Sequence, residues 1–371
     1  MRIGIDARVL QGERRGQWRY AWCLIDALLK SDTRNSYVLF YHGFRRQEFV
    51  FEPRANLEQV WCHVPGQLVK PLWEYCNWPP VELLLRRKID VFHNLLNFNR
   101  VFLTPVPSKC PMVATYHGIA DPKTLFDSFG YTLEDTKRWL NRLASDASIV
   151  IAISELVRDN LLEYVSFPQE KIRVVYSGVE ERFLRPVDGG EKLRRLGLEG
   201  KRFFFYVGGM EQNKNLKRLL EAFSSLGMED TWLAIAGEIS AARKSELEAI
   251  AKSRVLFTGR ISDDELMVFY RECLAYVLPT IYEGFGLPVL EAMACGAAVI
   301  VSKYTGIAEK VGEYVMQFDP LDTGQLLACL RRLSEDEPFR QSMKKRGPQK
   351  AAEFTWEKTA QQVIAVYEAC A

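Results

Sequence analysis

At 371 residues the chain is too long for a single domain with one hydrophobic core, and its length is typical of two domains. Its 49 basic and 47 acidic residues leave a net charge of +2, which gives no reason to expect a nucleic-acid partner. The eight cysteines form no Cys-x-x-Cys pair, and several lie in apolar runs. This pattern predicts buried free thiols in a reducing compartment and argues against a disulfide framework.

The first half of the chain alternates short apolar runs with longer amphipathic ones, which predicts a parallel sheet covered by helices. It begins with a strand at Ile3–Ala7, and a helix follows from about Arg15 to Lys30. Ser154, with Glu155 after it, should cap a later helix. Further strands are expected at residues 37–41, 57–64, 91–93, 112–116, 148–153 and 171–176.

Turn signals with little periodicity mark the segment from Ser177 to Gly190, so we place the domain junction there. A second set of strands is expected at residues 203–207, 232–236, 255–258, 275–278 and 298–301. Helices rich in Lys, Glu and Leu separate these strands. The fold class is therefore α/β, with two doubly wound, Rossmann-like parallel-sheet domains and a cleft between them. Ligands of such sheets bind at the carboxyl ends of the strands.

Residues 283–291 read Glu-Gly-Phe-Gly-Leu-Pro-Val-Leu-Glu and carry the most informative motif. Pro288 suits a first helical turn, so the N–H groups of Leu287, Val289 and Leu290 should be unpaired and face a ligand with the positive end of the helix dipole. Such a place binds phosphate, and the two glycines permit close approach. Carboxylates beside a diphosphate would accept hydrogen bonds from sugar hydroxyls. The predicted contacts are Glu283, Gly284, Phe285, Gly286, Leu287 and Glu291.

The alternative for this motif is a capped surface helix, in which Glu291 complements the helix dipole. On the spacing of the two glutamates alone, that alternative is favoured. The choice between a nucleotide-sugar site and a surface helix therefore depends on the neighbouring loops.

The loop after the strand at 203–207 also suits a phosphate ligand. Gly208 and Gly209 offer backbone amides, and Lys214 stands at the start of a basic helix that includes Arg218. Amides would cradle a diphosphate there, and the ammonium would neutralise it. The alternative is an ordinary turn followed by a solvated lysine.

A third loop opens on the same sheet edge, after the strand at 255–258. Arg260 and Ile261 lie in it, and their backbone could form hydrogen bonds with a nucleotide base. The alternative is that this corner only leads into a helix capped by Ser262. Three loops thus converge on one predicted ligand.

Five segments, taken in order, form a pattern that covers nearly the whole chain. They are residues 1–8 with Tyr20, 175–183, 206–215, 279–296 and 354–360. This pattern resembles the retaining glycosyltransferases of family 4, also called group 1, which have the GT-B fold. The resemblance implies an acceptor-side domain at 1–180, a nucleotide-sugar donor domain at 181–353, and a final helix at 354–371 that crosses back to the first domain.

The resemblance also implies roles for single residues. Glu283 would hold hydroxyls of the donor sugar beside the reacting carbon, and Glu291 would accept from the ribose. Lys214 and the amides after Phe285 would stabilise the departing diphosphate. His117, at the end of a first-domain strand, would face the donor sugar across the cleft. Without the resemblance, a structural role with a backbone partner is the favoured explanation for a lone histidine at a strand end.

Two loops depart from the family pattern. Gly209 and Asn213 stand where the family often has arginine, so positive charge on the phosphates would depend mainly on Lys214 and the helix dipole. In the first-domain loop, Gly16 matches the pattern, but Trp18 replaces a second glycine. That substitution leaves the role of this loop open.

The implied reaction transfers a hexosyl group, with mannosyl favoured, to a glycan or polyprenyl-linked acceptor with retention of anomeric configuration. GDP-mannose is the first expectation for the donor, and UDP-hexoses come next. The sequence contains no Asp-x-Asp, so we expect no metal and no cofactor; cationic side chains and amides would stabilise the leaving group. Two other functions stay open, a sugar-nucleotide epimerase on the same architecture and a non-catalytic nucleotide-sugar binding protein.

Basic clusters and one aromatic run are candidates for contact with a membrane surface. The clusters lie at residues 14–19, 45–46 and 86–88, and the aromatic run spans 72–80. A solvated face is the favoured explanation for the basic clusters, with a membrane surface or a charged acceptor as the alternative. The aromatic run could stack on a sugar or contact lipid, and core packing explains it at least as well. No apolar run reaches the ~18 residues of a membrane span, and the chain enters its first strand without a signal peptide. We expect a cytoplasmic protein with, at most, peripheral contact at the inner face of a membrane.

Overall fold

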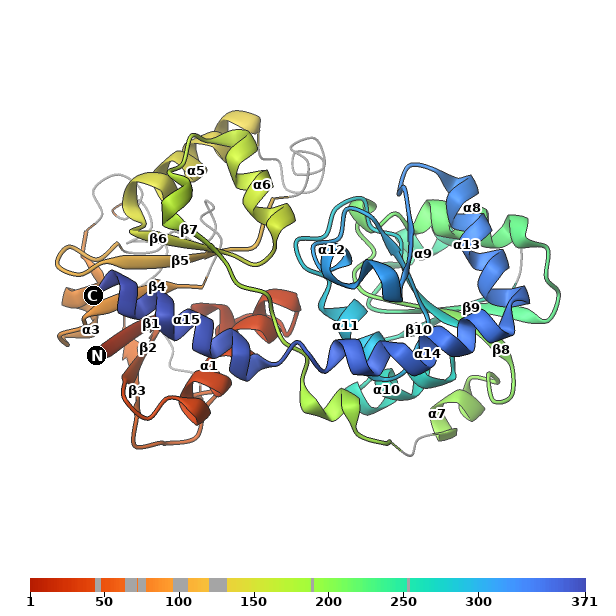
Figure 1. Cartoon of the computed structure of the whole chain (residues 1–371), viewed down its shortest axis with the longest axis horizontal. Helices are drawn as coiled ribbons and strands as arrows, with labels where there is room; N and C mark the ends of the chain where they lie inside the picture. The colour runs from red at the N-terminus through yellow and green to blue at the C-terminus, as the bar shows by residue number, and fades with distance from the viewer. Residues whose placement is uncertain are drawn as a thin grey trace. The chain divides into compact units, whose positions relative to one another are not determined.

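The computed structural model divides into two compact units, each with most of its residue contacts within itself (Figure 1). The described residues are 1–43, 48–63, 72, 78–95, 106–119, 132–187, 190–251 and 254–371. The first unit holds the described parts of 1–119, 132–177 and 356–371, and the second unit holds those of 178–355. Each unit contains its own sheet and its own buried core.

The first unit is built on a seven-stranded parallel sheet in the order β3-β2-β1-β4-β5-β6-β7. Its strands are β1 (Arg2–Asp6), β2 (Ser36–His42), β3 (Leu57–Cys62), β4 (Val91–Asn94), β5 (Met112–Tyr116), β6 (Ile149–Ala152) and β7 (Ile172–Val174). Its helices are α1 (Gly16–Ser31), α3 (Val81–Leu85), α5 (Leu133–Asp146), α6 (Glu155–Tyr164) and α15 (Trp356–Cys370). The central strands are buried on both faces, as expected for a parallel sheet.

The strand predictions for this half are confirmed, although β7 is shorter than the run expected at 171–176. Ser154 caps α6 as predicted, because its hydroxyl oxygen accepts from the Val157 N–H at 3.1 Å. The seven described cysteines are free thiols, also as predicted.

The second unit is built on a six-stranded parallel sheet in the order β10-β9-β8-β11-β12-β13. Its strands are β8 (Arg202–Val207), β9 (Thr231–Ala236), β10 (Val255–Gly259), β11 (Ala275–Leu278), β12 (Val299–Ser302) and β13 (Met316–Phe318). Its helices are α7 (Gly190–Arg195), α8 (Leu216–Leu226), α9 (Ala241–Ile250), α10 (Asp263–Glu272), α11 (Leu287–Ala294), α12 (Ala308–Val311), α13 (Thr323–Glu335) and α14 (Glu337–Ala351). The strand order reverses between β8 and β11, and ligands of doubly wound sheets bind at such a reversal.

One strand of the second unit was not predicted. β13 has three residues, of which only Phe318 is buried, so its sequence carries almost no periodicity. The other strand predictions for this half are confirmed, and Ser262 caps α10 through a reciprocal capping box with Glu265. None of the helices in the described part of the chain is long and apolar enough to cross a membrane.

The last helix, α15, belongs to the first unit and packs along α1 (Figure 1). A buried histidine ties it to the sheet. His93 Nδ1 lies 2.6 Å from the Tyr367 hydroxyl, and His93 Nε2 lies 2.8 Å from Thr115 Oγ1. Burial lowers the pKa of His93 to about 3. His93 is therefore a neutral structural residue that joins β4, β5 and α15.

This buried histidine should make the protein sensitive to acid. Because the folded pKa of His93 lies far below its ordinary value of 6.5, the unfolded chain binds the extra proton first as pH falls. As pH falls below 6.5, this group should therefore lower the free energy of unfolding by about 1.4 kcal/mol per pH unit. Thermal unfolding between pH 6.5 and pH 4.5 measures the slope, which should be shallower in His93→Gln. His63→Gln, at an exposed histidine, should leave it unchanged; equal slopes in wild type and His93→Gln would contradict the assignment.

Candidate functional site

Two loops of the second unit meet at the reversal in strand order. One follows β8 and ends at Lys214, and the other follows β11 and runs to Gly286. Asn213 joins them, because its carbonyl accepts from the Ile281 N–H at 2.9 Å and from Thr280 Oγ1 at 3.1 Å. The carboxyl ends of two neighbouring strands thus carry loops that are fixed to one another.

This junction brings Lys214 and Glu283 together. Lys214 Nζ lies 2.7 Å from Glu283 Oε2, and the two side chains are 23% and 27% exposed. Burial alone would lower the pKa of Lys214, but the Glu283 carboxylate and its hydrogen bond raise it overall. The ammonium therefore stays charged at neutral pH and lies in contact with a partly exposed carboxylate.

The loop that carries Glu283 is held by the segment after β12. The Glu283 N–H donates to the Tyr304 carbonyl and the Gly306 N–H donates to the Glu283 carbonyl, both at 3.0 Å. The Ile307 N–H donates to the Phe285 carbonyl at 2.8 Å. These three bonds pair residues 283–285 with the segment 304–307, so the backbone that carries the Glu283 side chain is fixed.

The helix that follows begins as predicted, with Gly286 as its N-cap at φ +97° and Pro288 in the first turn. One expectation was wrong. The Val289 N–H is paired, because it donates to the Gly286 carbonyl at 2.9 Å in a tightened first turn. The N–H of Leu287, the first residue of α11, has no acceptor within its own helix. The amide contribution at this end is therefore smaller than the sequence suggested.

Glu291 lies inside the second unit and is 5% exposed. The Tyr270 hydroxyl, from α10, donates to Glu291 Oε2 over 3.5 Å. The alternative of a surface helix with Glu291 as an exposed charge is therefore wrong. Burial of a carboxylate costs free energy unless hydrogen-bond donors face it.

The glycine pair after β8 differs from the prediction. The Gly208 N–H donates to the Ala236 carbonyl at 3.1 Å, so it is not available to cradle a phosphate. A Cβ on Gly209 would lie 1.9 Å from Glu211 Oε2, so that carboxylate covers one side of Gly209. A phosphate approaching from that side would meet a negative charge. Lys214, and not the Gly208 amide, is the group of this loop that suits an anion.

The two predicted arginines are engaged with neighbours. Arg218, half-buried in the first turn of α8, donates from Nη1 to Asn215 Oδ1 at 2.9 Å. Arg260 is exposed and pairs with Glu238 at 2.6 Å, and Ile261 beside it is half-buried. Contact of these three residues with a donor stays a prediction.

His117 belongs to the first unit. Its Nε2 lies 3.1 Å from the Leu95 carbonyl, and its ring meets Tyr20 edge-on at 4.8 Å between centroids. Burial lowers the pKa of His117 to about 4, so the ring is neutral at pH 7. The contact with the Leu95 carbonyl is the backbone partner expected if His117 has a structural role. A role for His117 toward the donor sugar stays a prediction.

The first-domain loop leads into α1, whose first residue is Gly16. The large ring of Trp18 lies along the helix: its Nε1 donates to the Leu10 carbonyl at 3.2 Å, and it stacks on Trp22 at 6.3 Å between centroids. The Arg14 guanidinium lies over the same ring, 5.1 Å from its centroid. Trp18 is thus held by its own unit, and a ligand role for Gly16 stays a prediction.

Comparison with known proteins supports one family over both halves. Residues 14–183 match the family described as Glycosyltransferase Family 4, and residues 190–350 match Glycosyl transferases group 1. The chain is a family 4, group 1 glycosyltransferase. It is 27% identical over 270 residues to the O-antigen chain mannosyltransferase B of Escherichia coli, covering 69% of this chain and 70% of that protein. It is 29% identical over 240 residues to the mannosyltransferase WbdA of Escherichia coli, but the match spans only 29% of WbdA.

Solved structures show the GT-B fold of this glycosyltransferase. Sucrose-phosphate synthase from Thermosynechococcus elongatus superposes with a TM-score of 0.78 at 19% identity, covering 100% of this chain and 98% of that chain. Anabaena HepE in complex with UDP and glucose gives 0.73 at 17% identity, with 100% of both chains covered. The fold class predicted from the sequence is therefore confirmed.

Sequence reasoning missed Asn215 in this glycosyltransferase. Its side-chain amide is buried and donates to the carbonyls of Pro279 at 2.9 Å and Pro320 at 2.8 Å. Its backbone is left-handed, with φ +58°, just before α8 begins. Asparagine tolerates this conformation better than most residues, so an asparagine directly before a helix start was the available signal. Asn215 fixes the loop that presents Lys214.

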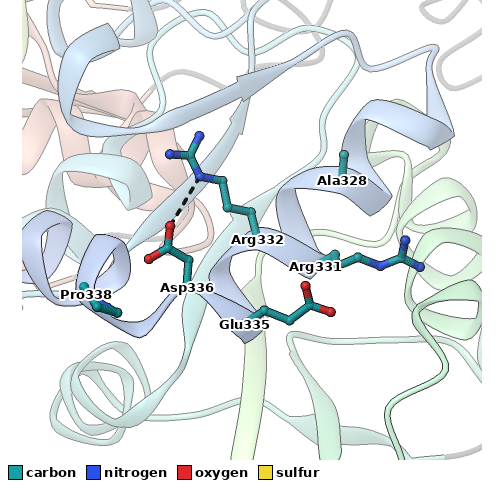
Figure 2. Close-up of a pocket in the computed structure, with 6 residues that line it drawn as sticks. All are labelled: Ala328, Arg331, Arg332, Glu335, Asp336 and Pro338. Atoms are coloured by element: carbon teal, nitrogen blue, oxygen red, sulfur yellow. Dashed lines mark ion pairs between the residues drawn. The ribbon is translucent and has the colours of Figure 1, made fainter.

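The glycosyltransferase also has a surface hollow away from these loops. It has a volume of about 590 Å³ and lies at the turn between α13 and α14 (Figure 2). Six residues line it: Ala328, Arg331, Arg332, Glu335, Asp336 and Pro338. Arg332 pairs with Asp336 at 3.9 Å, and the lining carries two arginines and two acids, so its formal charges balance. None of the predicted site residues lies in this hollow. In the described residues, no group of three or more His, Cys, Asp or Glu side chains is placed to hold a metal ion.

Proposed function

We propose that this glycosyltransferase moves a hexosyl group, with mannosyl favoured, from a nucleotide-sugar to a glycan or polyprenyl-linked acceptor. Anomeric configuration is retained and no metal is required. The observation that carries the proposal is the contact between Lys214 and Glu283 at the reversal in strand order, in front of α11. A cation for a diphosphate and an acceptor for sugar hydroxyls stand side by side there.

The chain's residues divide the chemistry as follows. The bond between the anomeric carbon and the diphosphate oxygen breaks, and negative charge develops on the phosphates. Lys214 and the Leu287 N–H stabilise that charge, while Glu283 accepts hydrogen bonds from the donor hexose. Glu291 accepts from the ribose. The acceptor hydroxyl forms the new bond on the face that the phosphate leaves, and its proton passes to a donor phosphate oxygen.

Mannose is favoured as the transferred sugar because of the relatives' names. Two of them are mannosyltransferases, at 27% and 29% identity. GDP-mannose is therefore the first donor, and the complex of Anabaena HepE with UDP and glucose makes UDP-hexoses the second. Metal independence is supported by Lys214, because its raised pKa keeps the side chain charged and an ammonium can neutralise a diphosphate in place of a divalent cation.

A thermal-shift screen tests the donor and the metal together. Samples with EDTA receive GDP, UDP, ADP, GDP-mannose or UDP-glucose at one common concentration. A ligand present at 100 times its Kd adds about 2.7 kcal/mol of apparent stability, so the ligand that binds most tightly gives the largest shift. We expect the largest rise in unfolding temperature with GDP-mannose, and no further rise when manganese replaces EDTA. A larger rise with UDP-glucose would move the donor to UDP-hexoses. Binding only with manganese would overturn metal independence. Chromatography of the nucleotide-sugar after incubation without acceptor tests the epimerase, which an epimeric product would favour.

The acceptor side carries a candidate membrane contact. Trp78 and Leu83 are 56% and 57% exposed, and the exposed basic residues Arg86, Arg87 and Lys88 follow in the chain. Apolar side chains beside basic ones suit the surface of an anionic bilayer, and we propose peripheral contact there at the cytoplasmic face. Sedimentation with phosphatidylglycerol vesicles tests it: protein that stays in the supernatant contradicts it. The basic pair at 45–46 and most of the aromatic run at 72–80 lie outside the described residues.

A further inference from the structure

A hydroxyl beside the Glu283 loop is buried without a hydrogen-bond partner. Thr305 follows β12 and is 2% exposed, and its Oγ1 has no hydrogen-bond partner among the described residues. Buried hydroxyls are nearly always paired, because an unpaired one costs free energy. This hydroxyl lies beside the Glu283 loop and not at a remote place in the core, so a partner that comes within reach when the substrate binds is the natural explanation.

The backbone directs Thr305 toward the site. Thr305 and Glu283 form a parallel bridge, in which Glu283 exchanges hydrogen bonds with the residues on either side of Thr305. Because side chains alternate between faces along an extended segment, partners in such a bridge project from the same face. The Thr305 methyl, Cγ2, would lie 2.6 Å from a Cβ on Gly286, the N-cap of α11. The Thr305 side chain is therefore placed beside both Glu283 and the start of the helix.

The present partner of Glu283 is also the group that a donor needs. Lys214 Nζ donates to Glu283 Oε2 at 2.7 Å. Under the proposed function, on which this inference rests, a diphosphate draws the ammonium toward itself. The Glu283 carboxylate then lies near two phosphates, and its ion pair with Lys214, its only cationic partner among the described residues, is weakened. A neutral donor close to the carboxylate would restore what is lost, since a carboxylate accepts several hydrogen bonds.

We propose that Thr305 is a positioning residue for Glu283. Its hydroxyl donates a hydrogen bond to the Glu283 carboxylate when Lys214 turns to the donor diphosphate, and so keeps the carboxylate aimed at the hexose hydroxyls. No covalent bond changes at Thr305. Since the hydrogen bond forms only with donor in place, it acts on turnover more than on nucleotide affinity.

Thr305→Val and Thr305→Ser separate the hydroxyl from the methyl group. Valine keeps the shape and the contact with Gly286 but removes the hydroxyl, whereas serine keeps the hydroxyl and removes the methyl. We expect kcat for the nucleotide-sugar to fall about tenfold in Thr305→Val, the effect of one hydrogen bond to a charged group, with the donor KM within about twofold. Thr305→Ser should stay within about twofold of wild type in both constants. Should the valine variant fail to fold, Thr305→Ala replaces it, because alanine and serine at this position differ only in the hydroxyl.

A purely structural role makes the opposite prediction, because the methyl packs on Gly286 and serine would then be the slower variant. Wild-type kcat in Thr305→Val, or equal losses in the valine and serine variants, would overturn the inference while leaving the proposed function standing. A wild-type enzyme that consumes no nucleotide-sugar would remove the proposed function, and this inference with it.

Discussion

Replacing Glu283 with glutamine should lower kcat by about 10²- to 10³-fold while nucleoside diphosphate binding survives. The amide keeps the size of the side chain and its place on the fixed loop, but it removes the charge that attracts donor hydroxyls. The variant also releases Lys214 from its ion pair, so the ammonium becomes fully available to phosphate. Affinity for GDP or UDP should therefore stay equal or rise by up to about fivefold, the usual limit for a partly exposed pair.

Glu199→Gln is the matched control for this variant. Glu199 also pairs with a basic residue of the second unit, Arg194 at 3.0 Å, but both side chains are largely exposed and lie outside the predicted site. Its replacement should change neither turnover nor binding. Titration calorimetry with the nucleoside diphosphate and a coupled assay for its release measure the two effects separately. Undiminished turnover in Glu283→Gln would refute the role of this carboxylate, and weaker nucleotide binding would contradict the competition with phosphate.

The fold was predictable because most strands are four to seven residues long and buried, so each reads as an apolar run between turn signals. β13 escaped because three residues with one buried side chain give no pattern. The start of α11 was predictable from Pro288 and the glycine before it, since both residue types have narrow backbone requirements. These strands and this helix start were predictable because each depends on the conformational preferences of neighbouring residues.

The site was only partly predictable, because its contacts depend on distance in space. Nothing in the sequence shows that Lys214 and Glu283, 69 positions apart, form an ion pair. The glycine at 208 was expected to offer its amide to a ligand, but a neighbouring strand end uses that amide. Whether a backbone N–H is free depends on register between strands, which composition and motif do not fix. The same limit applies to Thr305, whose importance comes from its bridge to Glu283.

Replacing Lys214 with methionine should weaken binding of nucleoside diphosphates by about 10- to 100-fold and lower kcat by about 10²- to 10³-fold. Methionine keeps an unbranched side chain of similar length but removes the ammonium that faces the leaving group. The loss in kcat is expected because negative charge on the diphosphate is greatest as the bond to the sugar breaks. The variant also leaves the Glu283 carboxylate without its counter-charge beside the incoming phosphates.

Lys244→Met, which breaks a surface pair with Glu248 on α9, is the matched control and should bind and turn over like wild type. The sign of the change in nucleotide affinity is the decisive result. Loss of the carboxylate at 283 should maintain or strengthen binding, and loss of the ammonium at 214 should weaken it, because the two groups act on phosphate with opposite charges. In the double variant Lys214→Met/Glu283→Gln, binding should recover part of the loss, since the uncompensated carboxylate is gone. If Lys214→Met bound nucleoside diphosphate as tightly as wild type in EDTA, the leaving group would be stabilised by other groups, and the assignment of this loop would fail.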